Sequence, residues 1–175
     1  MGNTTVDNRY ANRALLFVTL ACIIPLLIIF SVSLSNPGSP FLNQIADATR
    51  STPSVTSAFN PVMTKVMDIY VKSAPVAGIL AFMFLLKKRK PLEIKKRAEL
   101  IRACFLSPFV YVFFIYFFLV HNLELTTAGR TIRWMSENNF SLLLLYIMLY
   151  IATFFITYAV CYTPVLACKL MRERQ

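Results

Sequence analysis

Histidine is nearly absent from this 175-residue sequence, and with it go several kinds of chemistry. His121 is the single histidine, which argues against a haem held between helices by paired histidines. His121 and Glu124 would supply only two ligands, too few for a metal site. The sequence also has no glycine-rich phosphate loop, nucleophile elbow or metalloprotease helix. We therefore predict no catalytic residues, no metal, no cofactor and no small-molecule substrate.

Charge is missing from the four apolar runs at 14–34, 73–86, 103–120 and 140–168, which contain no Asp, Glu, Lys, Arg or His. A transporter or proton pump needs ionisable groups at membrane depth, so this absence argues against transport. Hydrophobic residues make up 57% of the chain and the mean hydropathy is +0.61, more apolar surface than a small water-soluble domain can bury. The sequence predicts an all-α, polytopic membrane protein.

The predicted architecture is one membrane domain over residues 1–175 with four transmembrane helices. The spans cover about 14–34, 66–86, 103–120 and 140–163, with periplasmic loops at 35–65 and 121–139 and a cytoplasmic loop at 87–102. The second span must begin before its apolar run, because fourteen residues give only about 21 Å of helix against a hydrocarbon core of about 30 Å. Asn60 followed by Pro61 is a helix start signal. A short helix at 41–48 is expected in the first outer loop.

Basic residues outnumber acidic ones by 18 to 8, and they gather on one side of the predicted spans. Thirteen of the eighteen lie in 1–13, 87–102 and 169–175, and the other five are assigned to the opposite side. Lys/Arg-rich loops stay in the cytoplasm, so we expect both termini there. The residues expected to set this topology are Lys87, Lys88, Arg89, Lys90, Lys95, Lys96 and Arg97. Charge at helix ends favours the phospholipid bilayer, and not nucleic acid, as its partner.

Two patterns in the second span indicate packing. Ala77 and Ala81 repeat every fourth residue beside Gly78, and such small-residue ridges let helices approach closely in lipid, so this span is predicted to be the packing centre. Asp68 and Lys72 share another face at i and i+4, where an ion pair is favourable. We interpret that charged face as structural in preference to a recognition surface.

The third span is crowded with aromatic residues and leaves two interpretations open. Cys104, Ser107, Tyr111 and Phe114 fall on one stripe, with Val110 beside it. Such a stripe packs inside the bundle, or it forms a face for a foreign helix.

Several separated strings resemble one known family. They are NPVMTKVMDIYVKSAP at 60–75, LSPFVY at 106–111, NLELTTAGR at 122–130 and RQ at 174–175. Together they resemble the immunity proteins of A-type pore-forming colicins, the group for colicins A, B, N, U and Y. The resemblance implies a non-catalytic protein of the bacterial inner membrane that binds the membrane-inserted channel domain of a cognate colicin and prevents pore opening. It also agrees with four spans and inside termini.

Within that resemblance, the hypothesis for the colicin-binding face is Cys104, Ser107, Val110, Tyr111 and Phe114. The strings around Asp68 and Glu124 are expected to hold the outer loops together. Two other classes stay open: a small membrane transporter or channel subunit, and a scaffold subunit of an envelope complex.

Overall fold

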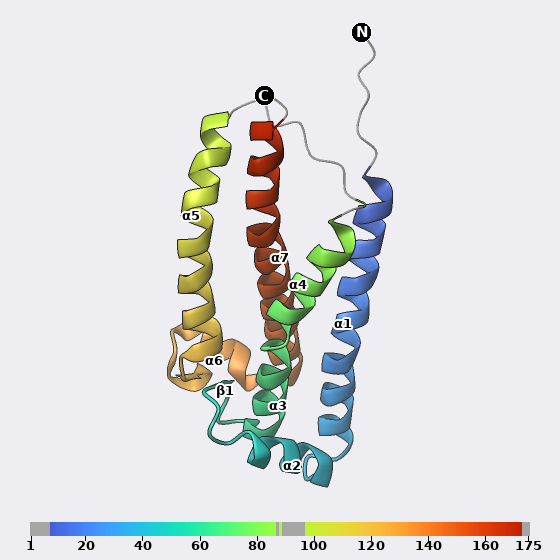
Figure 1. Ribbon diagram of the computed structural model, residues 1–175. Helices are drawn as coiled ribbons and strands as arrows, with labels where there is room; N and C mark the ends of the chain where they lie inside the picture. Colours follow the sequence, from blue (N-terminus) through green and yellow to red (C-terminus); the bar gives the residue numbers. More distant parts are fainter. Residues whose placement is uncertain (1–7, 87, 89–96, 173–175) are drawn as a thin grey trace.

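The structure is a computed structural model that describes residues 8–86, 88 and 97–172. Its elements, labelled in Figure 1, are α1 (Arg9–Ser35), α2 (Pro40–Ala48), β1 (Val55–Thr56), α3 (Pro61–Val71), α4 (Ala74–Leu85), α5 (Arg97–Ile115), a π-helical turn (Tyr116–Val120), β2 (Leu123–Glu124), a 3-10 turn (Leu125–Thr127), α6 (Arg130–Glu137) and α7 (Asn139–Arg172). The chain is mostly helical, as predicted, and the two short strands are an addition that the sequence did not suggest.

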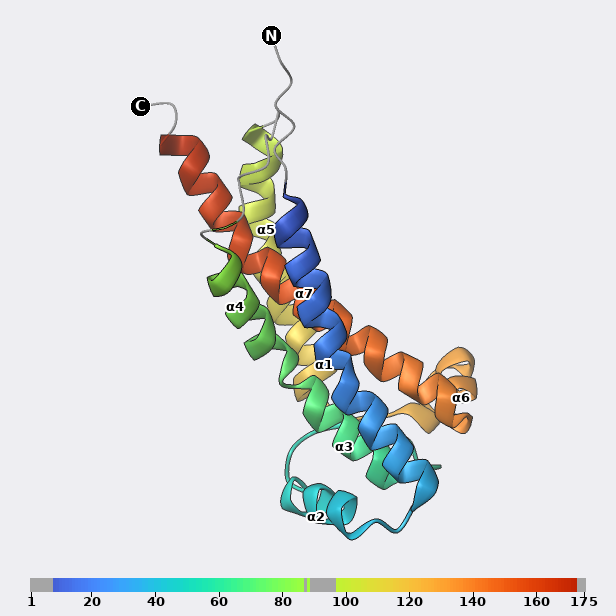
Figure 2. The same cartoon turned by 90° about the vertical axis from the view of Figure 1, so that its right-hand side faces the viewer.

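In the part of the chain that the structure describes, three helical segments are long and apolar enough to cross a membrane. They are Arg9–Ser35, Pro61–Leu85 and Asn139–Cys168, and a fourth, shorter apolar helix covers Cys104–Val120. α1 begins and α7 ends at the same end of the bundle, where α4 also ends and α5 begins (Figures 1 and 2). The opposite end carries α2, α6 and the strands.

The helix that leads into the second predicted span begins at Pro61, as its start signal indicated, but this segment is two helices and not one. α3 ends at Val71 and α4 starts at Ala74. Pro75 explains the break, because it has no N–H to donate and its ring crowds the carbonyl four residues earlier. The Tyr70 carbonyl instead accepts hydrogen bonds from the Ser73 N–H, at 2.9 Å, and from the Ser73 hydroxyl, at 2.7 Å.

α7 is the central helix of the bundle and packs against α1, α3, α4, α5 and α6. The prediction that the second span is the packing centre was therefore only partly right: α4 is the main partner of α7, which itself occupies the centre. Along α7, Tyr146, Tyr150 and Phe154 are fully buried. The Tyr150 ring stacks on Tyr70 of α3 with centroids 5.3 Å apart.

Large apolar side chains cover much of the outer surface. Phe17 of α1 is 77% exposed and Phe109 of α5 is 75% exposed, although both belong to the most hydrophobic parts of the chain. Water would disfavour such a surface, whereas hydrocarbon tails solvate it. Hydrocarbon favours apolar side chains on the outside of the bundle and disfavours hydroxyl groups there.

Candidate functional site

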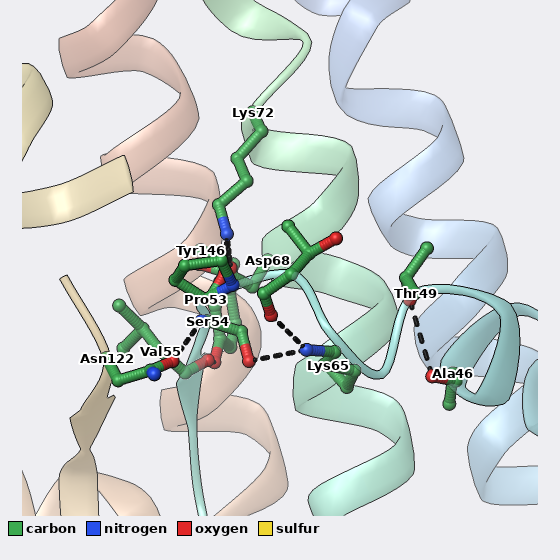
Figure 3. A network of polar contacts seen from close by, with 11 residues as sticks. Ala46, Thr49, Pro53, Ser54, Val55, Lys65, Asp68, Lys72, Asn122 and Tyr146 are labelled. Atoms are coloured by element: carbon green, nitrogen blue, oxygen red, sulfur yellow. Dashed lines mark hydrogen bonds and ion pairs between the residues drawn. The ribbon is translucent and has the colours of Figure 1, made fainter. Parts of the chain in front are cut away.

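An ion pair on α3 lies at the centre of a polar cluster at the loop end of the bundle. Asp68 is fully buried, and Lys72 Nζ lies 2.9 Å from Asp68 Oδ2 one helical turn away. The Lys72 ammonium also donates to the Pro53 carbonyl, so it connects α3 to the loop before β1. Figure 3 shows Lys72 reaching this loop from above Asp68. Because the carboxylate is fully buried, the pair is sensitive to the loss of either partner.

The same loop is held by three further side chains, each from a different segment (Figure 3). Lys65 Nζ of α3 donates to the Thr52 carbonyl at 2.5 Å and to Ser54 Oγ at 2.9 Å. Tyr146 of α7 donates to the Val55 carbonyl at 2.8 Å. Asn122 Oδ1 accepts from the Ser54 N–H at 2.8 Å. We call these residues, with Asp68 and Lys72, the outer-loop cluster.

The outer-loop cluster joins parts of the chain that are far apart in sequence. β1 pairs in parallel with β2, so that Val55 lies opposite Leu123 and Thr56 opposite Glu124. Ser57 Oγ donates to the Ser136 carbonyl at 3.1 Å. Nearby, Asn60 Nδ2 donates to Asn139 Oδ1 at 2.5 Å. The Asn60 side chain makes this contact and does not cap the start of α3. The segments 52–60 and 122–139 therefore form one polar unit.

Sequence reasoning placed Lys65 on one helix face with Asp68 and Lys72, and it expected the strings around Asp68 and Glu124, the second of which begins at Asn122, to hold the loops together. It missed Tyr146 as a member of this cluster. Tyr146 lies in an apolar run, and its role depends on a carbonyl 91 residues away. No sequence pattern indicates that contact.

Four of the five residues predicted to bind a partner lie on the side of α5 that meets α7. Cys104, Ser107, Tyr111 and Phe114 are half-buried, while Val110 is 53% exposed. The Cys104 thiol donates to the Thr163 carbonyl at 3.6 Å, and the hydroxyl oxygens of Tyr111 and Thr157 lie 3.2 Å apart.

The outward side of α5, continued into the π-helical turn Tyr116–Val120, carries an aromatic ridge that sequence reasoning did not single out. Phe105, Phe109, Phe113 and Phe117 recur every fourth residue, and they are 74%, 75%, 71% and 42% exposed. The spacing of four was available in the sequence as a signal. The two sides of α5 therefore differ: one carries small and hydroxyl groups against α7, and the other presents phenylalanine rings.

The residues predicted to set topology lie mainly outside the described part of the chain. These are Lys87, Arg89, Lys90, Lys95 and Lys96; Arg97 begins α5, and its side chain is not described. Lys88 is described, and its ammonium lies 3.3 Å from the Tyr10 hydroxyl of α1.

The residues predicted for helix packing lie on α4. Ala77 is half-buried, and Gly78 and Ala81 are buried.

Among the described residues, no three His, Cys, Asp or Glu side chains gather as a metal site. The fold and the polar cluster define a class: a helical protein with segments long and apolar enough to span a membrane, whose loops at one end of the bundle are fixed by internal contacts and whose helix faces are apolar. The chain belongs to the colicin immunity family, since the model described as "Colicin immunity protein" matches residues 38–175.

Individual relatives support the same membership. The chain is 47% identical over 169 residues to the colicin-A immunity protein of Citrobacter freundii, covering 97% of this chain and 95% of the relative. It is 37% identical over 168 residues to the colicin-B immunity protein of Escherichia coli, covering 96% of each. The colicin-N immunity protein of Escherichia coli is 36% identical over 84 residues, 46% of this chain and 62% of the relative. No solved structure matches. The resemblance inferred from the sequence is confirmed.

Proposed function

We propose that this protein is a colicin immunity protein that protects a bacteriocin-producing cell by binding the membrane-inserted channel domain of its cognate colicin and preventing pore opening. The observation that carries the proposal is the similarity over nearly the full length to the colicin-A and colicin-B immunity proteins. An immunity protein of this kind acts by binding and is not an enzyme. Its partners are the channel domain and the surrounding phospholipid, and no nucleic acid is involved.

The proposed topology has four spans, with both termini and the loop 87–102 in the cytoplasm and the whole of 1–175 in one membrane domain. It is supported by the shared location of the start of α1, the end of α4, the start of α5 and the end of α7. Thirteen of the eighteen basic residues belong to the segments at these positions. A Lys/Arg excess of this kind keeps loops on the cytoplasmic side of the bacterial inner membrane.

The proposed binding face is on α5, at Cys104, Ser107, Val110, Tyr111 and Phe114. Between the described helices, α5 packs mainly against α7, and it is the shorter apolar helix, so a foreign helix has room to lie beside it. Val110 is accessible directly, whereas Tyr111 shares a hydrogen bond with Thr157. A colicin helix that contacts Tyr111 must exchange that bond for one of its own, which provides a means of selecting the cognate channel.

The test is protection of a sensitive strain that expresses this protein against a panel of pore-forming and nuclease colicins, with receptor-matched controls. We expect survival against one or a few A-type pore formers and killing by the nuclease colicins. Killing by every pore former in the panel, with the protein inserted and accumulated normally, would contradict the proposal.

A further inference from the structure

An apolar groove separates α1 from α4 near the end of the bundle where α1 begins. Its volume is about 290 Å³, and its lining includes Ala14, Val18 and Cys22 of α1 and Ala77, Leu80 and Phe84 of α4. Three of these side chains are alanine or cysteine, two further ones are long, and none carries a charge. The small side chains leave the space, and the larger ones form its outer walls: Leu80 is 59% exposed and Phe84 is 61% exposed.

A lysine lies at the end of this groove that is nearer the start of α1. Lys88 follows Phe84 by four residues, and its ammonium lies 4.5 Å from the Phe84 ring centroid and 5.0 Å from that of Tyr10. The same ammonium is 3.3 Å from the Tyr10 hydroxyl. Lys88 is exposed, so its stem rests on two aromatic rings while its charge stays accessible. Tyr10 and Ala14 are one helical turn apart, which makes the polar end and the groove continuous along α1.

The two helices that line the groove carry charge of one sign. α1 and α4 contain no acidic residue, and α1 brings Arg9 and Arg13 to the same end as Lys88. A ligand suited to this site has a long hydrocarbon chain that lies in the groove. It also has a negatively charged group about one helical turn away, beside Lys88. Basic pockets between transmembrane helices on the cytoplasmic side bind anionic lipid headgroups.

We propose that the groove between α1 and α4 binds an anionic phospholipid, with an acyl chain along Ala14, Val18 and Ala77 and the phosphate at Lys88 and Tyr10. The bound chain fills the space that the small side chains leave between the helices and links α1 to α4. The proposal requires only that this groove lies in a bilayer, and it holds whether or not the protein binds a colicin.

The experiment is native mass spectrometry of the full-length protein in detergent, with equimolar phosphatidylglycerol and phosphatidylcholine of identical acyl chains. We expect phosphatidylglycerol to be retained about fivefold more than phosphatidylcholine, the ratio expected from one headgroup contact with a lysine. Lys88→Gln should abolish this preference. Val18→Phe should fill the groove and lower the retention of both lipids, while the helical content measured by circular dichroism stays that of the parent protein.

Two matched variants act as controls. Arg130→Gln removes an exposed cation at the opposite end of the bundle, and Val112→Phe adds the same ring to the exposed side of α5. Both should behave like the parent protein. Equal retention of the two lipids by the parent would overturn the proposal. It would also be overturned by a preference that survives Lys88→Gln, by an equal loss in Arg130→Gln, or by unchanged retention in Val18→Phe.

Discussion

Gly78 of α4 lies against Thr157 of α7 with no room for a side chain between them. A Cβ at Gly78 would be 3.0 Å from the Thr157 Cβ and 2.9 Å from the Phe154 carbonyl oxygen. The Thr157 hydroxyl meanwhile donates within its own helix to the Thr153 carbonyl, at 2.7 Å. The two backbones therefore approach as closely as glycine allows, in the way that small residues promote in lipid.

Gly78→Ala should destabilise the bundle, because the new methyl group meets a carbonyl that belongs to the backbone of α7. We expect a loss of about 1–3 kcal/mol, as for overpacking of a tight core. Unfolding of the purified protein by SDS measures it. Gly129→Ala is the matched control, since nothing lies within 4 Å of a Cβ there and its φ of −55° suits alanine. Equal stability of the two variants would contradict the close approach.

Removing either partner of the Asp68–Lys72 pair should lower accumulation in the membrane. Lys72→Ala leaves a fully buried carboxylate without its counter-charge, a change that costs about 3–5 kcal/mol in protein interiors. Asp68→Ala leaves the Lys72 ammonium bound to the Pro53 carbonyl but without its carboxylate, and the double variant should lose less than the sum of the two. Immunoblots of membrane fractions provide the measurement.

Arg133→Ala is the control for that experiment. The Arg133–Glu137 contact is 3.9 Å long, and its side chains are 65% and 48% exposed, so its loss should change stability by no more than about 1 kcal/mol. Normal accumulation of Asp68→Ala together with lost protection would show that Asp68 serves recognition and not structure.

Exchanging the proposed face of α5 should move protection from one colicin to another. The change replaces Cys104, Ser107, Val110, Tyr111 and Phe114 by the residues of a related immunity protein, and survival against both colicins is scored. The matched control exchanges the outward ridge of Phe105, Phe109 and Phe113. Unchanged specificity after the first exchange, or a switch produced only by the second, would assign recognition to another face.

Within the proposed face, Tyr111→Phe gives a finer test. It removes the hydroxyl that lies 3.2 Å from Thr157 and keeps the ring. The expected loss of stability is about 0.5–1.5 kcal/mol, the net worth of one hydrogen bond. If Tyr111 contacts the colicin through its hydroxyl, protection should fall by more than this stability change explains, as measured by the colicin concentration that kills half the cells.

Neutralising Lys87, Lys88, Arg89 and Lys90 to Gln should scramble or invert the orientation in the membrane. These four supply half of the eight basic residues of 87–102, and the Lys/Arg difference between sides sets orientation. Labelling of single cysteines placed in the outer and inner loops, with a membrane-impermeant reagent, reads the result. Labelling identical to the parent would mean that the remaining charges suffice to hold the orientation.

The sequence predicted the helical class, the start of a helix at Pro61 and the short helix near residues 41–48 because these depend on local properties. Hydropathy, N-terminal proline and helical spacing act within a few residues. The break between Val71 and Ala74 also has a local cause, which is Pro75. The continuous apolar run in the sequence hid this break. The two-residue strands were beyond prediction, because β1 and β2 form only by pairing across 68 residues.

By itself, the sequence determined that this protein is helical, rich in apolar surface and a member of the colicin immunity family, because composition and long non-periodic strings are properties of the chain alone. Only the tertiary structure decided that α7 is central, that Lys65, Tyr146 and Asn122 secure one loop, and that Cys104 and Tyr111 face inward. The faces of helices in lipid have similar hydrophobicity, so hydrophobicity alone does not determine which face of a helix packs inside the bundle. Close packing and a few hydrogen bonds between distant residues determine it.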